Sequence, residues 1–485
     1  DIHLSGRVKR KKRILILGAG GAGVMVLKEI QRSQLLGSKV IGFIDDDPKK
    51  IGQSISGVRV LGGAESMSSV VKQYNIDEII YAMPSLDQKK KKEYIKKASM
   101  TGVVVKAIPG IYEIIDDRVN ISEFREVQIE DLLGREPINI KDPKLREFIE
   151  DKVILITGGG GSIGSELARQ IAKFKPGRLV LVDVYENNVY ELQQELKRTI
   201  KNLHLTVLID TVRDLERMES IMEKYRPDYV FHAAAHKHVP LMEESFQSAV
   251  LNNVLGTYNM VKLSDKYHVK KFVMISTDKA VNPTNIMGAT KRIGEKIVQA
   301  YSTTSETDFV AVRFGNVLGS NGSVIPLFKK QIAEGGPITV THPDINRYFM
   351  TIPEACQLVL RAGSIAQGGE IFILDMGEPV KITDLAKDLI RLSGLKEGED
   401  IEIIFTGLRP GEKLYEELLL DTKSAQTTVY EKIFIEKLKP VSKELITEQV
   451  DHLIEGIYHE NRDQVVKEIM EMVPSFKPDE GPHES

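Results

Sequence analysis

The chain has 485 residues, of which 42% are hydrophobic and 28% charged, so it is a globular protein and not a mostly disordered one. With 66 basic and 69 acidic side chains its formal net charge is -3, which excludes a global attraction to nucleic acid. The single cysteine, Cys356, excludes an internal disulfide, favours a reducing cytoplasm, and lies on an apolar helical pattern typical of a core thiol. We find no apolar run of about 18 residues that would predict a membrane-spanning helix.

A basic cluster lies at the start of the sequence, in residues 7–13, behind Asp1 where a full-length chain would begin with Met. One interpretation is a solvated basic arm, here residues 1–12. The other is the cytoplasmic flank of a preceding membrane segment, where Lys and Arg accumulate. The residues alone leave both interpretations open.

The first glycine loop follows the apolar run from Arg13 to Gly18. It reads Gly18-Ala-Gly20-Gly-Ala-Gly23, leads into a helical pattern, and is followed by Asp45 after another buried strand. Further strands are predicted at 40–44, 78–82 and 103–108, so residues 13–115 are expected to form a Rossmann-like domain. No catalytic constellation follows this loop, and a nucleotide-binding or a purely structural role fits it as well as a second cofactor site. Residues 116–150 are predicted to be a connector.

The second glycine loop follows the strand predicted at Lys152–Thr157, with glycines at positions 158, 161 and 164. Such glycines let the backbone turn, approach a pyrophosphate and pack the helix on the strand. Asp183 ends the next strand about 20 residues on, where a carboxylate accepts hydrogen bonds from the adenosine ribose of NAD and repels the extra phosphate of NADP.

Strands alternate with helical patterns through the rest of this region, at 179–182, 205–209, 229–231, 271–275 and 309–312. The predicted fold class is therefore α/β, with two Rossmann-like, doubly wound parallel-sheet domains. The second comprises an NAD-binding catalytic domain at 151–312 and a smaller substrate-binding lobe with C-terminal helices at 313–476. Residues 477–485 are predicted to be a frayed tail.

The segment Ser276-Thr277-Asp278-Lys279-Ala-Val-Asn282-Pro283, followed by Met287-Gly-Ala-Thr-Lys291, resembles the active site of the extended short-chain dehydrogenase/reductase family. The TGxxGxxG-type loop, His232-Ala-Ala-Ala235 and Arg409-Pro-Gly-Glu412 agree with it. The Thr-Asp-Lys triplet is similar to that of the nucleotide-sugar 4,6-dehydratases, over residues 150 to 435. Residues 1–150 resemble the cytoplasmic Rossmann-like domain that precedes the catalytic domain in the large, membrane-anchored members.

Met287 departs from the wider family, which has Tyr-x-x-x-Lys at this spacing. A thioether cannot act as a base. Within the dehydratases, methionine here resembles the large bacterial subgroup that retains configuration at C5. A catalytically disabled, nucleotide-sensing protein is the alternative that the substitution leaves open.

The resemblance implies a chemical role for each residue of the triplet. NAD takes hydride from sugar C4, Lys279 removes the C5 proton, Asp278 protonates the C6 hydroxyl that leaves as water, and the hydride returns to C6. Without the tyrosine, Asp278 is also available to take the C4 hydroxyl proton. Thr277 would bond that hydroxyl and Lys291 the nicotinamide ribose. A neutral Lys279 requires a pKa lowered towards about 7 to 8 by burial or a nearby cation.

The resemblance also implies two sets of binding residues. The set around the cofactor is Gly158, Gly161, Ser162, Ile163, Gly164, Asp183, Thr211, Val212, Ala233, Ala234, Ala235, Lys237, Asn253 and Lys291. The set around the UDP-sugar is Asn316, Ser323, Val324, Arg347, Arg409 and Glu412, in which guanidinium groups suit paired phosphate oxygens.

No metal site is expected. His232, His236 and His238 lie near one another in the sequence, but no carboxylate or cysteine cluster accompanies them. The resemblance predicts an NAD-dependent UDP-N-acetylglucosamine 4,6-dehydratase, a lyase of bacterial polysaccharide or glycan synthesis, with a nucleotide-sugar 4-epimerase as the nearest rival. It further implies a homo-oligomer and favours a cytoplasmic chain from a protein anchored at the inner membrane, with membrane contact only through a missing N-terminal segment.

Overall fold

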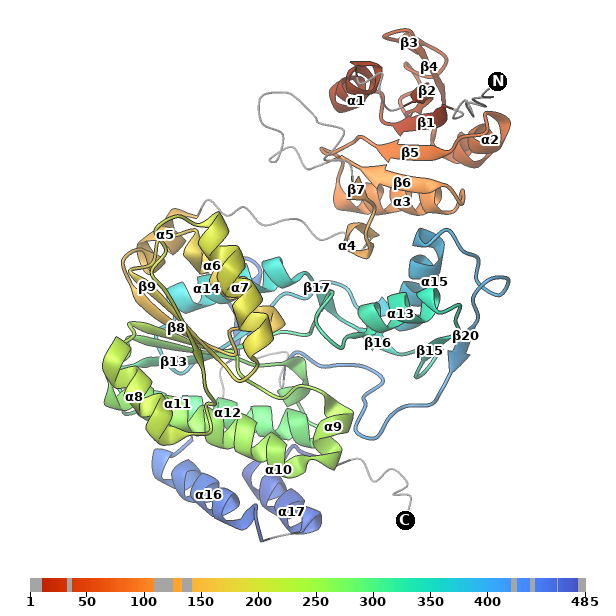
Figure 1. Cartoon of the computed structure of the whole chain (residues 1–485). Helices are drawn as coiled ribbons and strands as arrows, with labels where there is room; N and C mark the ends of the chain where they lie inside the picture. The colour runs from red at the N-terminus through yellow and green to blue at the C-terminus, as the bar shows by residue number, and fades with distance from the viewer. Residues whose placement is uncertain are drawn as a thin grey trace, which may run out of the picture. The chain divides into compact units, whose positions relative to one another are not determined.

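The computed structural model divides into two compact units (Figure 1), and each is described by itself. One comprises residues 1–136, 327–339 and 383–404, and the other residues 137–326, 340–382 and 405–485. The structure describes residues 11–32, 37–108, 125–132, 142–419, 425–436, 441–459 and 461–478. Most of the predicted basic arm and of the predicted tail therefore lies outside the described residues.

The N-terminal sheet confirms the four strands predicted around the first glycine loop and adds three. Its order is β3-β4-β2-β1-β5-β6-β7, with parallel pairs throughout except at the two edges. The strands are β1 Lys12–Leu17, β2 Ser38–Ile44, β3 Ser54–Ile55, β4 Val58–Gly62, β5 Glu78–Tyr81, β6 Val104–Ala107 and β7 Arg125–Glu126. The helices are α1 Gly21–Arg32, η2 Ala64–Ser66, α2 Met67–Gln73 and α3 Gln88–Ser99.

The predicted connector, 116–150, is not structureless where the structure describes it. It contributes β7 to the N-terminal sheet and contains α4 Ile129–Leu132 and α5 Pro143–Ile149. Pro143 begins α5 at a position where its missing N–H costs nothing, and the Asp142 side chain accepts the Lys144 N–H as the cap.

The large sheet runs in the order β10-β9-β8-β11-β12-β13-β18-β22-β21. Its first seven strands are parallel and their order is that of a doubly wound, dinucleotide-binding sheet, while β22 and β21 are antiparallel additions. The strands are β8 Val153–Thr157, β9 Arg178–Asp183, β10 Leu205–Ile209, β11 Tyr229–His232, β12 Lys271–Ile275, β13 Asp308–Arg313, β18 Ile371–Leu374, β21 Ala425–Thr427 and β22 Ile433–Glu436.

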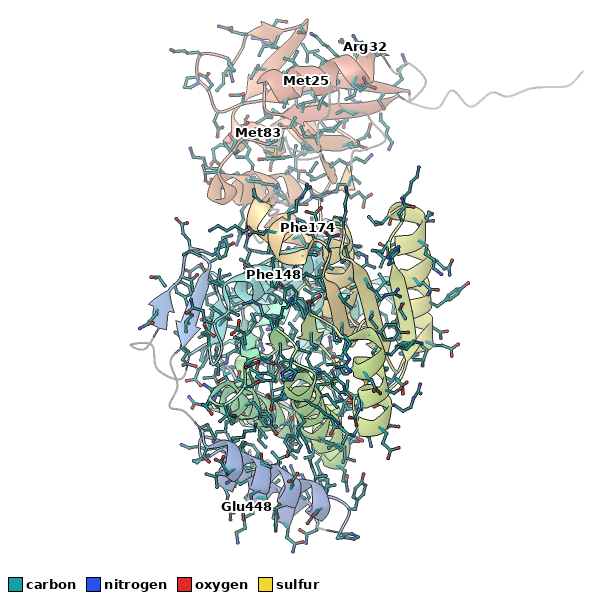
Figure 2. The ribbon with its side chains drawn as sticks, turned by 90° about the vertical axis from the view of Figure 1, so that its left-hand side faces the viewer. Met25, Arg32, Met83, Phe148, Phe174 and Glu448 are labelled. Atoms are coloured by element: carbon teal, nitrogen blue, oxygen red, sulfur yellow. The ribbon has the colours of Figure 1, made fainter. Side chains whose placement is uncertain are left out.

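Helices cover both faces of this sheet (Figure 1). One apolar cluster joins the sheet to α5, α6 Ser162–Ala172, α7 Glu186–Thr199 and α14 Ile352–Ile365, and includes Phe148 and Phe174 (Figure 2) as well as buried Cys356. The cluster on the opposite face involves α8 Leu215–Tyr225, α9 Val239–Glu244, α10 Phe246–Ala249, η5 Val250–Leu255, α11 Gly256–Lys266, α12 Ile286–Ser302, α16 Lys443–Gly456 and α17 Arg462–Met472.

Short elements follow β13 and make up the remainder of the chain. They are β14 Asn316–Val317, α13 Val324–Ala333, β15 Ile338–Val340, β16 Asn346–Arg347, β17 Phe349–Met350, β19 Val380–Lys381, α15 Ile382–Leu392 and β20 Ile403–Phe405. β14 pairs with β17 and β16 with β19. The backbone N–H and the side-chain amide of Asn316 both donate to the carbonyl of Tyr348, the residue after Arg347. No helix within the described residues is long and apolar enough to cross a membrane.

Candidate active site

The second glycine loop lies between β8 and α6, and its shape depends on glycine at two positions. Gly158 has φ +70° and approaches the next strand end so closely that a Cβ there would lie 2.7 Å from the Ala234 nitrogen. A Cβ on Gly164 would lie 2.0 Å from the Gly158 oxygen, so only glycine lets α6 pack against the loop. The first turn of α6, including Ser162 and Ile163, therefore begins directly at the loop.

A cavity of about 250 Å³ lies beside this loop. Its lining contains seven of the residues assigned to the cofactor: Gly158, Gly161, Asp183, Val212, Ala233, Ala234 and Ala235. The remaining lining residues did not stand out in the sequence: Gly160, Val182, Val184, Tyr185, Asn188 and Asp210. Asp210 could have been found from its position in the sequence. It follows β10 directly, and Asp183 is the last residue of β9, so both carboxylates lie at the same edge of the parallel sheet.

Asp183 shapes the loop as well as lining the cavity. One of its carboxylate oxygens accepts the Gly160 N–H at 2.8 Å and the other accepts the Tyr185 N–H at 2.9 Å. Each oxygen keeps a further lone pair, so the carboxylate can still accept hydroxyl donors from a ligand.

The histidine at the end of β11 is a structural group. His232 is fully buried between two threonine hydroxyls, with Nδ1 2.8 Å from Thr157 Oγ1 and Nε2 3.0 Å from Thr257 Oγ1. Burial, with a smaller contribution from Lys291, lowers the pKa of His232 to about 3, so the ring is neutral at physiological pH. Both nitrogens are occupied, which makes it unsuitable as a metal ligand.

Asn253 joins the loop after β11 to α12. Its side chain accepts the His236 N–H, and its amide donates to the His236 carbonyl and to Thr290 Oγ1. Thr211 and Lys237, which the resemblance placed beside the cofactor, are not among the cavity-lining residues; the Thr211 hydroxyl accepts the Arg213 N–H.

The Thr277–Lys279 segment follows β12 at the same edge of the sheet and contains a buried carboxylate beside an amine. Asp278 is completely buried, and its Oδ1 accepts from Thr277 Oγ1 at 2.9 Å and from Lys279 Nζ at 3.1 Å. Its Oδ2 is buried and has no hydrogen-bond partner within the described part of the chain.

The two lysines of the site differ in charge behaviour. Burial works to lower the pKa of Lys279, but Asp278 and Glu416 outweigh it and raise the pKa above its ordinary value. Burial lowers the pKa of Lys291 to about 8, against a smaller opposing effect of Glu295. The lowered pKa that the sequence required of Lys279 is therefore found at Lys291, and Lys279 is an ammonium group in this structure.

Met287 lies one helical turn before Lys291 on α12 and is buried in the apolar cluster. It supplies no acid or base. Two turns beyond it, Glu295 accepts from Ser276 Oγ at 2.7 Å and pairs with Arg292 and Arg313. This buried network fixes α12 to the strand end from which the Thr277–Lys279 segment departs.

The residues assigned to the sugar approach this segment from β14 and the loop after it. Gly315, next to Asn316, is close enough to Asp278 that a Cβ would lie 3.0 Å from Oδ2. The buried Ser323 hydroxyl has no partner among the residues described, and Val324 begins α13 directly after it. In the same loop, Asn321 N–H donates to Ser162 Oγ of the glycine loop.

Arg347 lies among carboxylates in this structure. Its Nη2 donates to Glu412 Oε1 at 3.2 Å, and its Nε lies 3.6 Å from Glu416 Oε1. Arg409 is exposed, and its backbone N–H donates to Glu412 Oε2. The arrangement thus brings Arg347 and Lys279 to Glu416, a residue that sequence reasoning missed, and Glu412 pairs with the same Arg347.

The positions of the 409–417 segment are fixed by contacts with the start of α12. Thr284 Oγ1 and Asn285 Nδ2 both donate to the Gly411 carbonyl, and Lys413 Nζ donates to the Val281 carbonyl. In the described residues no three His, Cys, Asp or Glu side chains gather closely enough to hold a metal ion.

Comparison with known proteins gives the family. A family model described as "Polysaccharide biosynthesis protein" matches residues 154–438, and one described as "CoA-binding domain" matches residues 2–109. The capsular polysaccharide biosynthesis protein CapD of Staphylococcus aureus is 48% identical over 92% of this chain and 74% of its own length. A UDP-glucose 4-epimerase of Rickettsia canadensis is 36% identical over 56% of this chain and 78% of its own.

Among solved structures, Pen from Bacillus thuringiensis is 38% identical and superposes with a TM-score of 0.55, covering 63% of this chain and 99% of its own. The fold, the glycine loop and the Thr-Asp-Lys segment agree with this relationship. The chain belongs to the polysaccharide biosynthesis protein family, a group of extended short-chain dehydrogenases/reductases.

Proposed function

We propose that this chain is an NAD-dependent UDP-N-acetylglucosamine 4,6-dehydratase. The observation that carries the proposal is the pair of buried Asp278 and partly buried Lys279, a carboxylate and an amine 3.1 Å apart at the sheet edge that also carries the glycine loop. Loss of water from a sugar needs both a base and an acid at adjacent carbons, and this pair provides one of each.

The cavity beside the glycine loop has the chemistry that the adenosine and pyrophosphate part of a dinucleotide needs. Gly158 and Gly164 leave room for a pyrophosphate, the N–H groups of α6 face it, and Asp183 offers carboxylate oxygens to the ribose hydroxyls. Lys291 would hold the nicotinamide ribose. When bound, NAD supplies a reversible hydride acceptor, so the reaction has no net redox change.

The chain's own residues then handle two protons, one at Asp278 and one at Lys279. Asp278 Oδ2 takes the proton of the C4 hydroxyl, and Thr277 holds that hydroxyl by a hydrogen bond. Lys279 Nζ takes the C5 proton and later returns it to C5. Asp278 gives its proton to the C6 hydroxyl, which leaves as water, so both side chains end as they began.

The test is incubation of the purified chain with UDP-N-acetylglucosamine and no added NAD, followed by mass spectrometry of the nucleotide sugar. A mass lower by one water, giving a 4-keto-6-deoxy product, supports the dehydratase. An unchanged mass with a new epimer supports a 4-epimerase, an alternative favoured by the 36% identity to a protein of that name. No turnover, even with NAD added, supports a nucleotide-sensing protein disabled at Met287.

Lys279→Met tests the base directly. We expect water loss to fall by about 10²- to 10⁴-fold, because the C5 proton then has no acceptor. Bound NAD should be unchanged, since Lys279 is not among the residues that line the cavity. The matched control is Lys330→Met, an exposed lysine whose only role in the described structure is a surface ion pair with Glu334. Undiminished turnover in Lys279→Met would remove this lysine as the base.

A further inference from the structure

Glu416 is a buried carboxylate that neither the cavity nor the family motifs single out. Only 3% of its side chain is exposed, and its Oε1 lies 3.3 Å from Lys279 Nζ and 3.6 Å from Arg347 Nε. Its Oε2 is buried and without a hydrogen-bond partner in the part of the chain that is described. A buried oxygen of this kind is costly unless a proton or a ligand satisfies it.

Asp278 shows the same pattern on the other side of Lys279. Each of the two carboxylates forms an ion pair with the ammonium group through one oxygen, and its other oxygen has no hydrogen-bond partner among the described residues. The two carboxylates, Lys279 and Arg347 make a set with two negative and two positive charges. The carboxylates are almost fully buried, while the Lys279 side chain is 20% exposed. Transfer of a proton from an ammonium group to a buried carboxylate beside it turns a charged pair into a neutral one, which avoids the cost of buried charge.

We propose that Glu416 is the proton-holding partner of Lys279: it takes the ammonium proton so that the free amine can attack C5–H. This rests on the proposed dehydratase function. The N–H bond at Lys279 Nζ breaks, an O–H bond forms at Glu416, and a charged pair becomes a neutral one. After the C5 proton has been taken and returned, the proton on Glu416 goes back to Lys279, and no external acid or base is consumed.

The pair of Asp278 and Lys279 does not by itself account for how Lys279 acts as a base. Lys279 is an ammonium group in the structure, since its two carboxylate neighbours raise its pKa, and an ammonium group cannot act as a base. Asp278 is needed for the C4 and C6 hydroxyl protons in the reaction described above. Glu416 is therefore the acceptor that remains within reach of Nζ.

Glu416→Gln is the test, with Glu416→Asp as the conservative variant and Glu417→Gln as the matched control. Glu417 is the half-exposed neighbour, bonded to Lys413 and Asn282, and glutamine can keep those bonds. We expect kcat for water loss to fall by about a hundredfold in Glu416→Gln with KM little changed. Aspartate should restore part of it, because it still holds a proton. In a single turnover of Glu416→Gln, the absorbance at 340 nm should show that reduced cofactor accumulates, since C4 oxidation does not need the free amine.

The pH profile separates proton transfer from a purely structural role. Wild-type kcat should be level through neutral pH, because the proton shift is internal. In Glu416→Gln it should rise with pH, because the proton must leave to solvent. An unchanged kcat, or a faster Glu416→Gln enzyme, would overturn the proposal: the carboxylate would then only hold Lys279 in its charged form.

A second measurement does not depend on the sugar reaction. Competitive labelling with acetic anhydride, read by mass spectrometry at Lys279, reports the pH at which its amine becomes free. That pH should fall by about 1 to 3 units in Glu416→Gln, since one of two anionic neighbours is removed, and stay constant in Glu417→Gln. If the pH in Glu416→Gln stays the same as in the wild type, the pairing of Glu416 with Lys279 is overturned, whether or not the chain turns over UDP-N-acetylglucosamine. If the pH shifts in a chain that shows no turnover, the pairing stands and only the dehydratase function is refuted.

Discussion

The two glycine loops of the chain have the same local plan and different surroundings. In each, a glycine follows a central parallel strand, and the helix behind it carries a glycine that packs against the first, Gly23 on Gly18 and Gly164 on Gly158. In each, an aspartate at the end of the next strand accepts a loop N–H, Asp45 from Ala19 and Asp183 from Gly160.

The difference lies at the neighbouring strand end. Beside Gly158 the chain after β11 is Ala233–Ala235, and the small side chains leave the cavity open. Beside Gly18 the corresponding residue after β5 is Met83 (Figure 2), whose Cγ lies 2.3 Å from where a Cβ on Gly18 would be. Lys50 also covers the Asp45 carboxylate, at 3.0 Å. The two loops thus share their packing glycines and differ in the side chains that the adjacent strand end places beside them.

The largest effect that separates the two loops should come from alanine at the packing glycine. Gly164→Ala places a Cβ 2.0 Å from the Gly158 oxygen and should displace α6, weakening NAD binding by about a hundredfold or more. Gly23→Ala makes an equally close contact with Gly18, at 1.9 Å, and should destabilise its own sheet without loss of NAD. Chromatography of the cofactor released from each purified variant is the measurement. Equal losses of NAD would contradict the comparison.

A smaller effect is expected at the two aspartates. Asp183→Ala should weaken NAD binding by roughly tenfold to hundredfold, the worth of one or two hydrogen bonds to a charged group. Asp45→Ala should leave it unchanged, because that carboxylate bonds Lys50 and backbone groups of its own domain. Titration calorimetry with NAD on cofactor-stripped chains measures both. A comparable loss in Asp45→Ala would show that the first loop takes part in binding this cofactor.

The smallest effect concerns how folding stability depends on pH. It compares the last residues of the strands that lie beside the two glycine loops, His232 in β11 and Tyr81 in β5. The folded pKa of His232, about 3, lies below the unfolded value near 6.5, so the unfolded chain binds the extra proton and stability is lost as pH falls from about 6.5 to 3. Between pH 7 and pH 5 this amounts to roughly 2 kcal/mol. Urea unfolding followed by circular dichroism should show that this part of the pH dependence disappears in His232→Gln. Tyr81→Phe is the control, since burial raises the pKa of Tyr81 far above this range.

Most of the fold was predictable because its signals are local. Strand, glycine loop and helix follow one another directly in the sequence, and every strand predicted around the two loops is present within a residue or two. β18, β21 and β22 were missed, since each has at most four residues and lies in a region of weak periodicity. Their positions depend on pairing between segments far apart in the sequence: β18 pairs with β13, β22 with β18, and β21 with β22.

The candidate site divides in the same way. Asp278, Lys279 and Lys291 were predictable because the motif that contains them is continuous. Glu416 was not, since its approach to Lys279 depends on the bonds from Thr284 and Asn285 to Gly411 between segments far apart in the chain. The charge of Lys279 was mispredicted for the same reason: the second carboxylate beside it was invisible in the sequence.

The antiparallel strand β22 has a consequence for how the protein is made. Arg313 is fully buried, and one of its two carboxylate partners, Glu436, lies in β22. On the ribosome, the N-terminal sheet has all its strands once β7 has emerged at residue 126, whereas the large sheet keeps an open edge at β18 until residue 436 arrives. Between residues 313 and 436 Arg313 thus has only one of its two carboxylate partners, and between residues 374 and 436 the edge of β18 is unpaired and open to pairing with other chains.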